Sequence, residues 1–107
     1  MKEKKNSRVN NPRYLLTKML SSDIKADLLT LFHKNPGIID TEDGVSSRMG
    51  LPPESIHRDV RDLVRLGILQ SEKFGAYIAI SLDVKRDKEV QSLLGKYFQK
   101  RKTSRKA

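Results

Sequence analysis

The sequence predicts a mainly α-helical protein with a small β-hairpin, which is an α+β fold. Two observations predict this class. Apolar residues recur three and four positions apart in several short segments, as they do along one face of a helix. A later segment instead alternates apolar and polar residues, as a half-buried strand does. The length of 107 residues leaves room for a single domain.

The N-terminal third is expected to hold a loose arm and two helices. Residues 1–12 are rich in lysine and asparagine and predict a disordered basic arm. A short helix follows over about 14–20. The next helix is expected to begin after Ser22, a good N-cap residue, and to end at Asn35-Pro36-Gly37. Its apolar face consists of Ile24, Leu28, Leu31 and Phe32.

Two further helices are expected around a tight turn. The two-residue extended piece Ile38-Ile39 comes first. Thr41 is then expected to cap a helix over about 41–49, which Gly50 ends. After a turn at Leu51-Pro52-Pro53, another helix is expected to run over about 53–66 and to stop at Gly67.

The rest of the chain predicts a hairpin and a final helix. The runs 68–71 and 76–82 flank a tight turn at Lys73-Phe74-Gly75, which places Lys73 at the tip. The final helix, over about 87–100, carries the apolar stripe Val90, Leu93, Leu94, Tyr97 and Phe98. Residues 101–107 are expected to be a disordered basic tail. The domain would therefore span 13–100, with its core motif at 22–82.

Three helices followed by a hairpin predict a winged helix-turn-helix over the core motif. The block Glu42–Leu51 resembles the first helix and the turn, and the block Pro53–Leu69 resembles a recognition helix that runs into the wing. With the hairpin, these blocks resemble winged-helix transcription regulators of the bacterial and archaeal ArsR and MarR kind. The resemblance implies binding to double-stranded DNA, commonly as a two-fold dimer. It is specific for the fold and not for a subfamily.

The candidate DNA-contacting residues lie mostly on the helix expected over 53–66. Its apolar residues line one side, so the opposite side is centred on His57, Arg61 and Arg65, with Arg58 alongside. These side chains can donate hydrogen bonds to phosphates or to base edges in the major groove. Including the helix start and the wing, the full set is Ser55, His57, Arg58, Arg61, Arg65 and Lys73.

A different interpretation of this helix stays open. Glu54 shares the basic face, and two aspartates flank it, so residues 53–66 carry no net charge when His57 is neutral. Arg58 and Asp62 are four residues apart, and an ion pair between them could hold the Arg58 side chain along the helix surface instead of directing it outward. The helix could then be a solvated face or a protein contact, and the protein a winged-helix interaction module.

Most of the positive charge lies at the two ends of the chain. Of the formal net charge of +9, residues 1–19 carry +5, residues 96–107 carry +6 and the residues between carry −2. Basic ends attract phosphates without regard to sequence, or they only keep a protein soluble. A third hypothesis is therefore a nonspecific nucleic-acid binder driven by its tails.

The apolar stripe of the final helix has two possible partners. It could pair two chains, in which case the homodimer surface is Val90, Leu93, Leu94, Tyr97 and Phe98. It could instead fold back and enlarge the core of its own chain.

Other classes of function lack their usual residues. The chain has no cysteine and two histidines, so we expect no disulfide, no metal site and no cofactor. No nucleophile–base pair or phosphate-binding loop occurs at a usable spacing, so we expect no enzyme. The longest apolar run, 76–80, is far shorter than the roughly 20 residues of a membrane span. Without a secretory signal, the expectation is a soluble cytoplasmic protein with no membrane partner.

Overall fold

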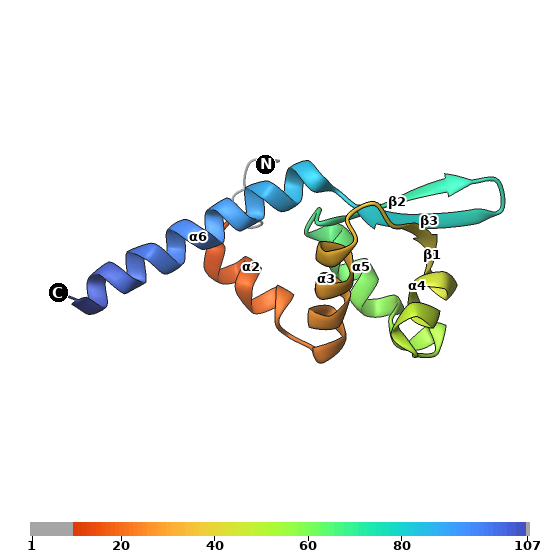
Figure 1. The fold of residues 1–107 in the computed structure, drawn as a ribbon, viewed down its shortest axis with the longest axis horizontal. Helices are drawn as coiled ribbons and strands as arrows, with labels where there is room; N and C mark the ends of the chain where they lie inside the picture. The colour runs from red at the N-terminus through yellow and green to blue at the C-terminus, as the bar shows by residue number, and fades with distance from the viewer. Residues whose placement is uncertain (1–9, 107) are drawn as a thin grey trace.

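The computed structural model describes the backbone of residues 10–106 and the side chains of residues 10–99. Within this range the chain is mainly helical with one small antiparallel sheet, which confirms the predicted α+β class (Figure 1). The elements follow one another as α2 (Pro12–Met19), α3 (Asp23–Lys34), β1 (Ile39–Thr41), α4 (Glu42–Met49), the 3₁₀ turn η1 (Pro53–Ser55), α5 (His57–Arg65), β2 (Leu69–Phe74), β3 (Tyr77–Leu82) and α6 (Val84–Lys106).

Side-chain caps fix where the first helices begin and end. The Ser22 hydroxyl accepts a hydrogen bond from the Lys25 backbone N–H at 3.0 Å, and the Thr41 hydroxyl accepts one from the Gly44 N–H at 3.1 Å. Gly50 ends α4 in the left-handed conformation, at φ +72°. These three boundaries confirm the sequence predictions.

The sheet has three strands in the order β1-β3-β2. The short piece around Ile39 does not stand alone, because β1 pairs with β3 and Ile39 lies opposite Ser81. The hairpin turn is Gly75-Ala76, with φ +61° at Gly75, as in a type II′ turn. Lys73 pairs with Ile78 inside the ladder, so its predicted place at the tip was wrong.

The core lies between the helices and one face of the sheet. Leu28 and Phe32 of α3 meet Val60 and Leu63 of α5 there, and all four are buried. Ile80 closes the core from the sheet side. Together, α3, β1, α4, α5 and the β2–β3 wing follow each other in the order of a winged helix-turn-helix, as predicted.

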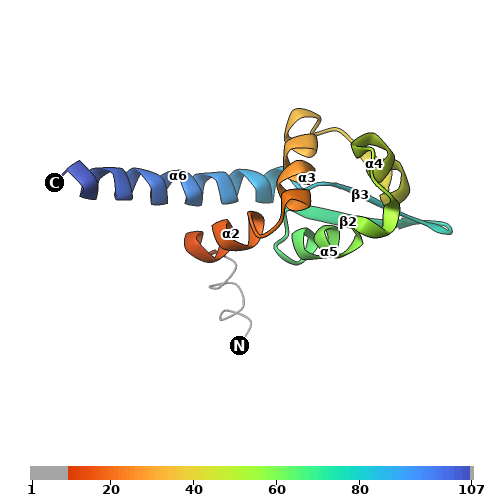
Figure 2. The ribbon, with the colours of Figure 1, turned by 90° about the horizontal axis from the view of Figure 1, so that it is seen from below.

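The last helix differs from its prediction at both ends. It begins at Val84 and continues to Lys106, through most of the segment expected to be a loose tail. Its first half lies beside α2 and its second half extends past the body of the protein (Figures 1 and 2). Within the part of the chain that is described, no helix has the length and apolar character needed to cross a membrane.

The apolar stripe of α6 is divided between the core and the surface. Val90 is fully buried in its own chain, and Leu93 and Leu94 are partly buried against the core. Phe98 remains 49% exposed. Assigning Val90 to a dimer surface was therefore wrong, because its side chain is already covered by the monomer. Of the N-terminal arm, Asn11 caps α2 and Pro12 begins it, and residues 1–9 lie outside the described range.

Candidate nucleic-acid interface

The segment predicted as one helix over 53–66 is two elements. Backbone bonds from Ser55 N to Pro52 O and from Ile56 N to Pro53 O form a single 3₁₀ turn, and the Ser55 hydroxyl also donates to Pro52 O at 2.7 Å. Ile56 is fully buried and separates this turn from α5, which begins at His57. Ser55 therefore precedes the helix instead of lying in its first turn, and its hydroxyl already has a local acceptor.

The arginines of α5 share one exposed face. At 3.6 residues per turn, Arg58, Arg61 and Arg65 fall within about 60° of arc around the helix axis. All three side chains are exposed. Arg58 and Arg61 form no hydrogen bond or ion pair with any described residue, and Arg65 has one long contact, 3.3 Å from Nη1 to Asp62 Oδ1. The guanidinium groups are thus available to an external anion.

Both aspartates of α5 are bonded to α3, and Asp62 alone also contacts an arginine, Arg65. Asp59 Oδ1 accepts a hydrogen bond from the Ser22 hydroxyl at 2.9 Å, and Asp62 Oδ2 lies 2.8 Å from Lys25 Nζ. The ion pair between Arg58 and Asp62, on which the structural interpretation of this helix relied, is not formed. Residues 53–66 carry no net charge only because Glu54 of η1 is counted; α5 itself holds three arginines and two aspartates, and its exposed face is basic.

Asp62 is held in its charged form by this arrangement. A hydrogen bond from Lys25 is the largest influence and lowers the pKa of Asp62 below its usual value of 3.8, in spite of partial burial, which raises it. Lys25 itself is only 4% exposed and also donates to the Ser21 hydroxyl at 2.7 Å. A charged pair therefore joins α3 to α5 at the border of the basic face.

His57 has a partner that the sequence did not indicate. Its Nδ1 lies 2.9 Å and 3.2 Å from the two carboxylate oxygens of Glu42, the first residue of α4. The contact links the two helices of the helix-turn-helix across the turn. The His57 side chain is half-exposed and lies at the edge of the basic face. Its contact with Glu42 also holds α4 against α5.

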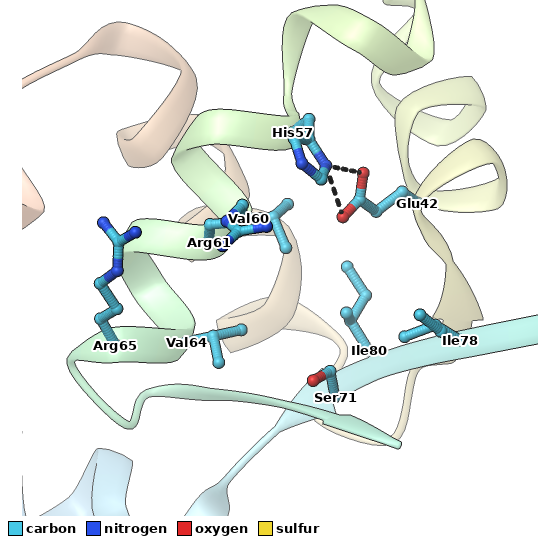
Figure 3. A pocket seen from close by; sticks show the side chains of 9 residues that line it. All are labelled: Glu42, His57, Val60, Arg61, Val64, Arg65, Ser71, Ile78 and Ile80. Carbon is cyan, nitrogen blue, oxygen red and sulfur yellow. Dashed lines mark hydrogen bonds and ion pairs between the residues drawn. The ribbon is translucent and has the colours of Figure 1, made fainter. Parts of the chain in front are cut away.

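A groove of about 320 Å³ separates α5 from the wing. Val60 and Val64 of α5 line one side, and Ile78 and Ile80 of β3 line the other (Figure 3). Arg61 and Arg65 stand at its edge with the remaining lining residues, Glu42, His57 and Ser71. Lys73 lies on the same face of β2 as Ser71, because alternate residues of a strand share a face. The helix and the wing thus present cations along one side of the molecule.

Two exposed aromatic residues of the wing were not singled out from the sequence. Phe74 and Tyr77 face each other across the end of the hairpin, on the sheet face opposite to Lys73. Tyr77 is 69% exposed. The signal was present in the alternation of the strand, since Tyr77 falls on the side opposite to the buried Ile80.

No family model, curated protein or solved structure matches this chain. Among the residues that are described, no group of three or more histidine, cysteine or acidic side chains is arranged to hold a metal ion.

Proposed function

We propose that this protein binds double-stranded DNA in a sequence-specific way, with α5 in the major groove, and acts as a small regulator of transcription. The observation that carries the proposal is the exposed face of Arg58, Arg61 and Arg65, whose neighbouring acids are bonded to α3. In a helix-turn-helix the second helix enters the major groove, and its N-terminal residues contact base edges. Here that helix is α5.

The three arginines have different positions along this helix, and we assign them different roles. Arg58 and Arg61 lie in the first half of α5, where the helix approaches the bases most closely, and a guanidinium can bond two acceptors of guanine. Arg65 ends the helix and is assigned a phosphate contact. Lys73 of the wing and His57 at the groove edge are assigned secondary contacts with the backbone, and Ser55 a weaker one because its hydroxyl is bonded to Pro52 O.

The basic ends and α6 add to this proposal. Six basic residues and no acid lie in residues 96–106, in the half of α6 that extends past the body (Figure 2). Counterion release from the duplex would strengthen binding of such a segment independently of sequence.

We further propose that two chains pair through the exposed part of the α6 stripe, at Phe98 with its neighbours Leu94 and Tyr97. Pairing would present two copies of α5 to successive turns of the duplex.

A pool of random-sequence duplexes tests the proposal. The protein is expected to retain duplex DNA at 50 mM salt and, at 150 mM salt, to enrich a sequence motif that footprinting then maps to about one turn of protected major groove per α5. Retention without enrichment would instead support a nonspecific binder. Absence of retention at both salt concentrations would contradict DNA binding altogether.

One observation favours a second candidate, a protein-interaction module. Phe74 and Tyr77 form an exposed apolar pair at the end of the wing, and such patches often mark protein contacts. In that case the chain would fail to retain DNA, and Tyr77→Ser would abolish binding to its protein partner.

A further inference from the structure

Lys25 is an unusual residue for the interior of a small protein. Lysine is almost never fully buried unless it is paired, and this one is 4% exposed. Its ammonium group lies between the Ser21 hydroxyl, at 2.7 Å, and the Asp62 carboxylate, at 2.8 Å. Replacing a buried ion pair by apolar residues is often neutral or stabilising, so stability alone does not explain why a lysine occupies this position.

The position of Asp62 on α5 suggests what the pair achieves. Asp62 follows Arg58 by four residues and precedes Arg65 by three, and these are the two spacings at which opposite charges on a helix form pairs. Around the helix axis it stands about 40° from Arg58, at the border of the basic face. A carboxylate here that was not bonded to α3 could pair with Arg58 as well as with Arg65 and would cancel one positive charge of the face.

The bond lengths show how the carboxylate is shared. Asp62 Oδ2 takes the short contact to Lys25, and Oδ1 takes the longer one, 3.3 Å, to Arg65. Arg58 receives neither. Three residues earlier, Asp59 is engaged in the same way, by the hydroxyl of Ser22 on α3. The start of α3 thus holds both acids of α5.

We infer that Lys25 is a positioning residue for nucleic-acid binding: it holds Asp62 against α3 and so keeps the basic face of α5 free for phosphates and bases. The inference rests on the proposed function, because it explains how a helix with two acids among its three arginines presents a cationic surface to DNA. Lys25 acts through Asp62 and does not itself touch the duplex.

The test compares Lys25→Met with the double variant Lys25→Met/Asp62→Asn. Methionine is close to lysine in length and adapts to irregular interior space, so the core remains filled. In the single variant Asp62 Oδ2 loses its partner on α3, so the carboxylate is free to pair with Arg58 and to pair more closely with Arg65. We expect its affinity for duplex DNA to fall on the order of tenfold at 50 mM salt, and its salt slope to decrease by about 0.9, the equivalent of one lost phosphate contact. In the double variant the competing charge is gone, and affinity is expected to return to within about twofold of the wild type.

A matched control separates this effect from a general loss of charge. Lys34→Met removes an exposed lysine from the same helix and is expected to leave affinity unchanged within about twofold. Asp62→Asn alone is expected to bind DNA at least as tightly as the wild type, and this arm decides the question if Lys25→Met fails to fold. Weaker binding by Asp62→Asn, or no rescue in a folded double variant, would overturn the inference.

The outcomes also distinguish the inference from the proposed function. If the wild type does not bind duplex DNA, the proposed function fails. If the wild type binds and a folded Lys25→Met binds equally well with the same salt slope, only the positioning role of Lys25 fails.

Discussion

His33 on the last turn of α3 bonds to Asp87 on the first turns of α6, with 2.7 Å between Nε2 and Oδ1. The carboxylate is buried, with 8% of its side chain exposed, and its second oxygen accepts a hydrogen bond from Gln91 at 2.9 Å. A residue to which the sequence assigned no role thus joins the long final helix to α3.

The first prediction concerns this contact. His33→Ala leaves one buried oxygen of Asp87 without its donor, so the free energy of unfolding should fall by about 1–3 kcal/mol. His57→Ala removes an exposed contact with Glu42 and should cost less than about 1 kcal/mol. Chemical denaturation of both variants measures the difference. Equal effects would show that the His33 contact does not secure α6.

The second prediction concerns the dependence of stability on pH. Folding lowers the pKa of Asp62 below 3.8, chiefly through the hydrogen bond from Lys25. The resulting stabilisation is present above the unfolded pKa and is lost as the pH falls through the lower folded value. Between pH 5 and pH 2, the stability of Asp62→Asn should therefore decline less steeply than that of the wild type. Asp27→Asn removes an exposed carboxylate from α3 and serves as control. Parallel curves for Asp62→Asn and the wild type would count against the Lys25 pair.

Local features of the chain were predictable from the sequence because their causes are local. Ser22, Thr41 and Gly50 mark helix ends through contacts within a few residues, and each boundary lies where the sequence predicts it. The hairpin also follows from strand alternation, but its turn was misplaced, because β2 continues to Phe74 and the turn is Gly75-Ala76. The division at Ile56 was missed, since 3.6-residue periodicity does not distinguish a 3₁₀ turn from the first turn of a helix.

The charge arrangement of the candidate site was not predictable, because it depends on contacts between helices. The spacing along α5 favours a pair between Arg58 and Asp62. The carboxylate instead bonds to Lys25, a buried residue of another helix. The same holds for His57 and Glu42, fifteen residues apart. No pattern within one helix reveals which of its charges a neighbouring helix will neutralise.

The third prediction concerns pairing of two chains. Phe98→Glu puts a charge on the exposed part of the α6 stripe, so it should convert a dimer into a monomer without changing the Tm of the monomer. Ser92→Glu alters the opposite, exposed side of α6 and should leave the dimer intact. Sedimentation at tens of micromolar measures the state of each variant. A monomeric wild type would show that α6 serves its own chain only.

The fourth prediction concerns the basic ends. A variant without residues 1–9 and 100–107 loses the cations Lys2, Lys4, Lys5, Arg8, Lys100, Arg101, Lys102, Arg105 and Lys106. If these contact phosphates, the slope of log affinity against log salt should fall by up to about 0.9 for each lost contact, while the preferred DNA sequence stays the same. Fluorescence anisotropy over a salt series gives the slope. Identical slopes before and after truncation would mean that the ends only aid solubility.

The fifth prediction concerns α5 as the helix that reads DNA. Arg58→Ala/Arg61→Ala should weaken binding to the selected site by about 1–3 kcal/mol per lost base contact. The difference in affinity between that site and random duplex should therefore become smaller. The Tm should stay unchanged, because neither side chain contacts a described residue through a hydrogen bond or ion pair. Lys34→Ala/Lys88→Ala removes the same charge from exposed positions on α3 and α6 and serves as control.

The most direct measurement is the ratio of affinities for the selected site and for random duplex, determined for both double variants under the same salt conditions. If α5 reads DNA, the ratio should stay close to that of the wild type for Lys34→Ala/Lys88→Ala and be at least tenfold smaller for Arg58→Ala/Arg61→Ala, since tenfold corresponds to about 1.4 kcal/mol. An unchanged ratio in Arg58→Ala/Arg61→Ala would contradict this prediction and exclude α5 as the element that reads DNA.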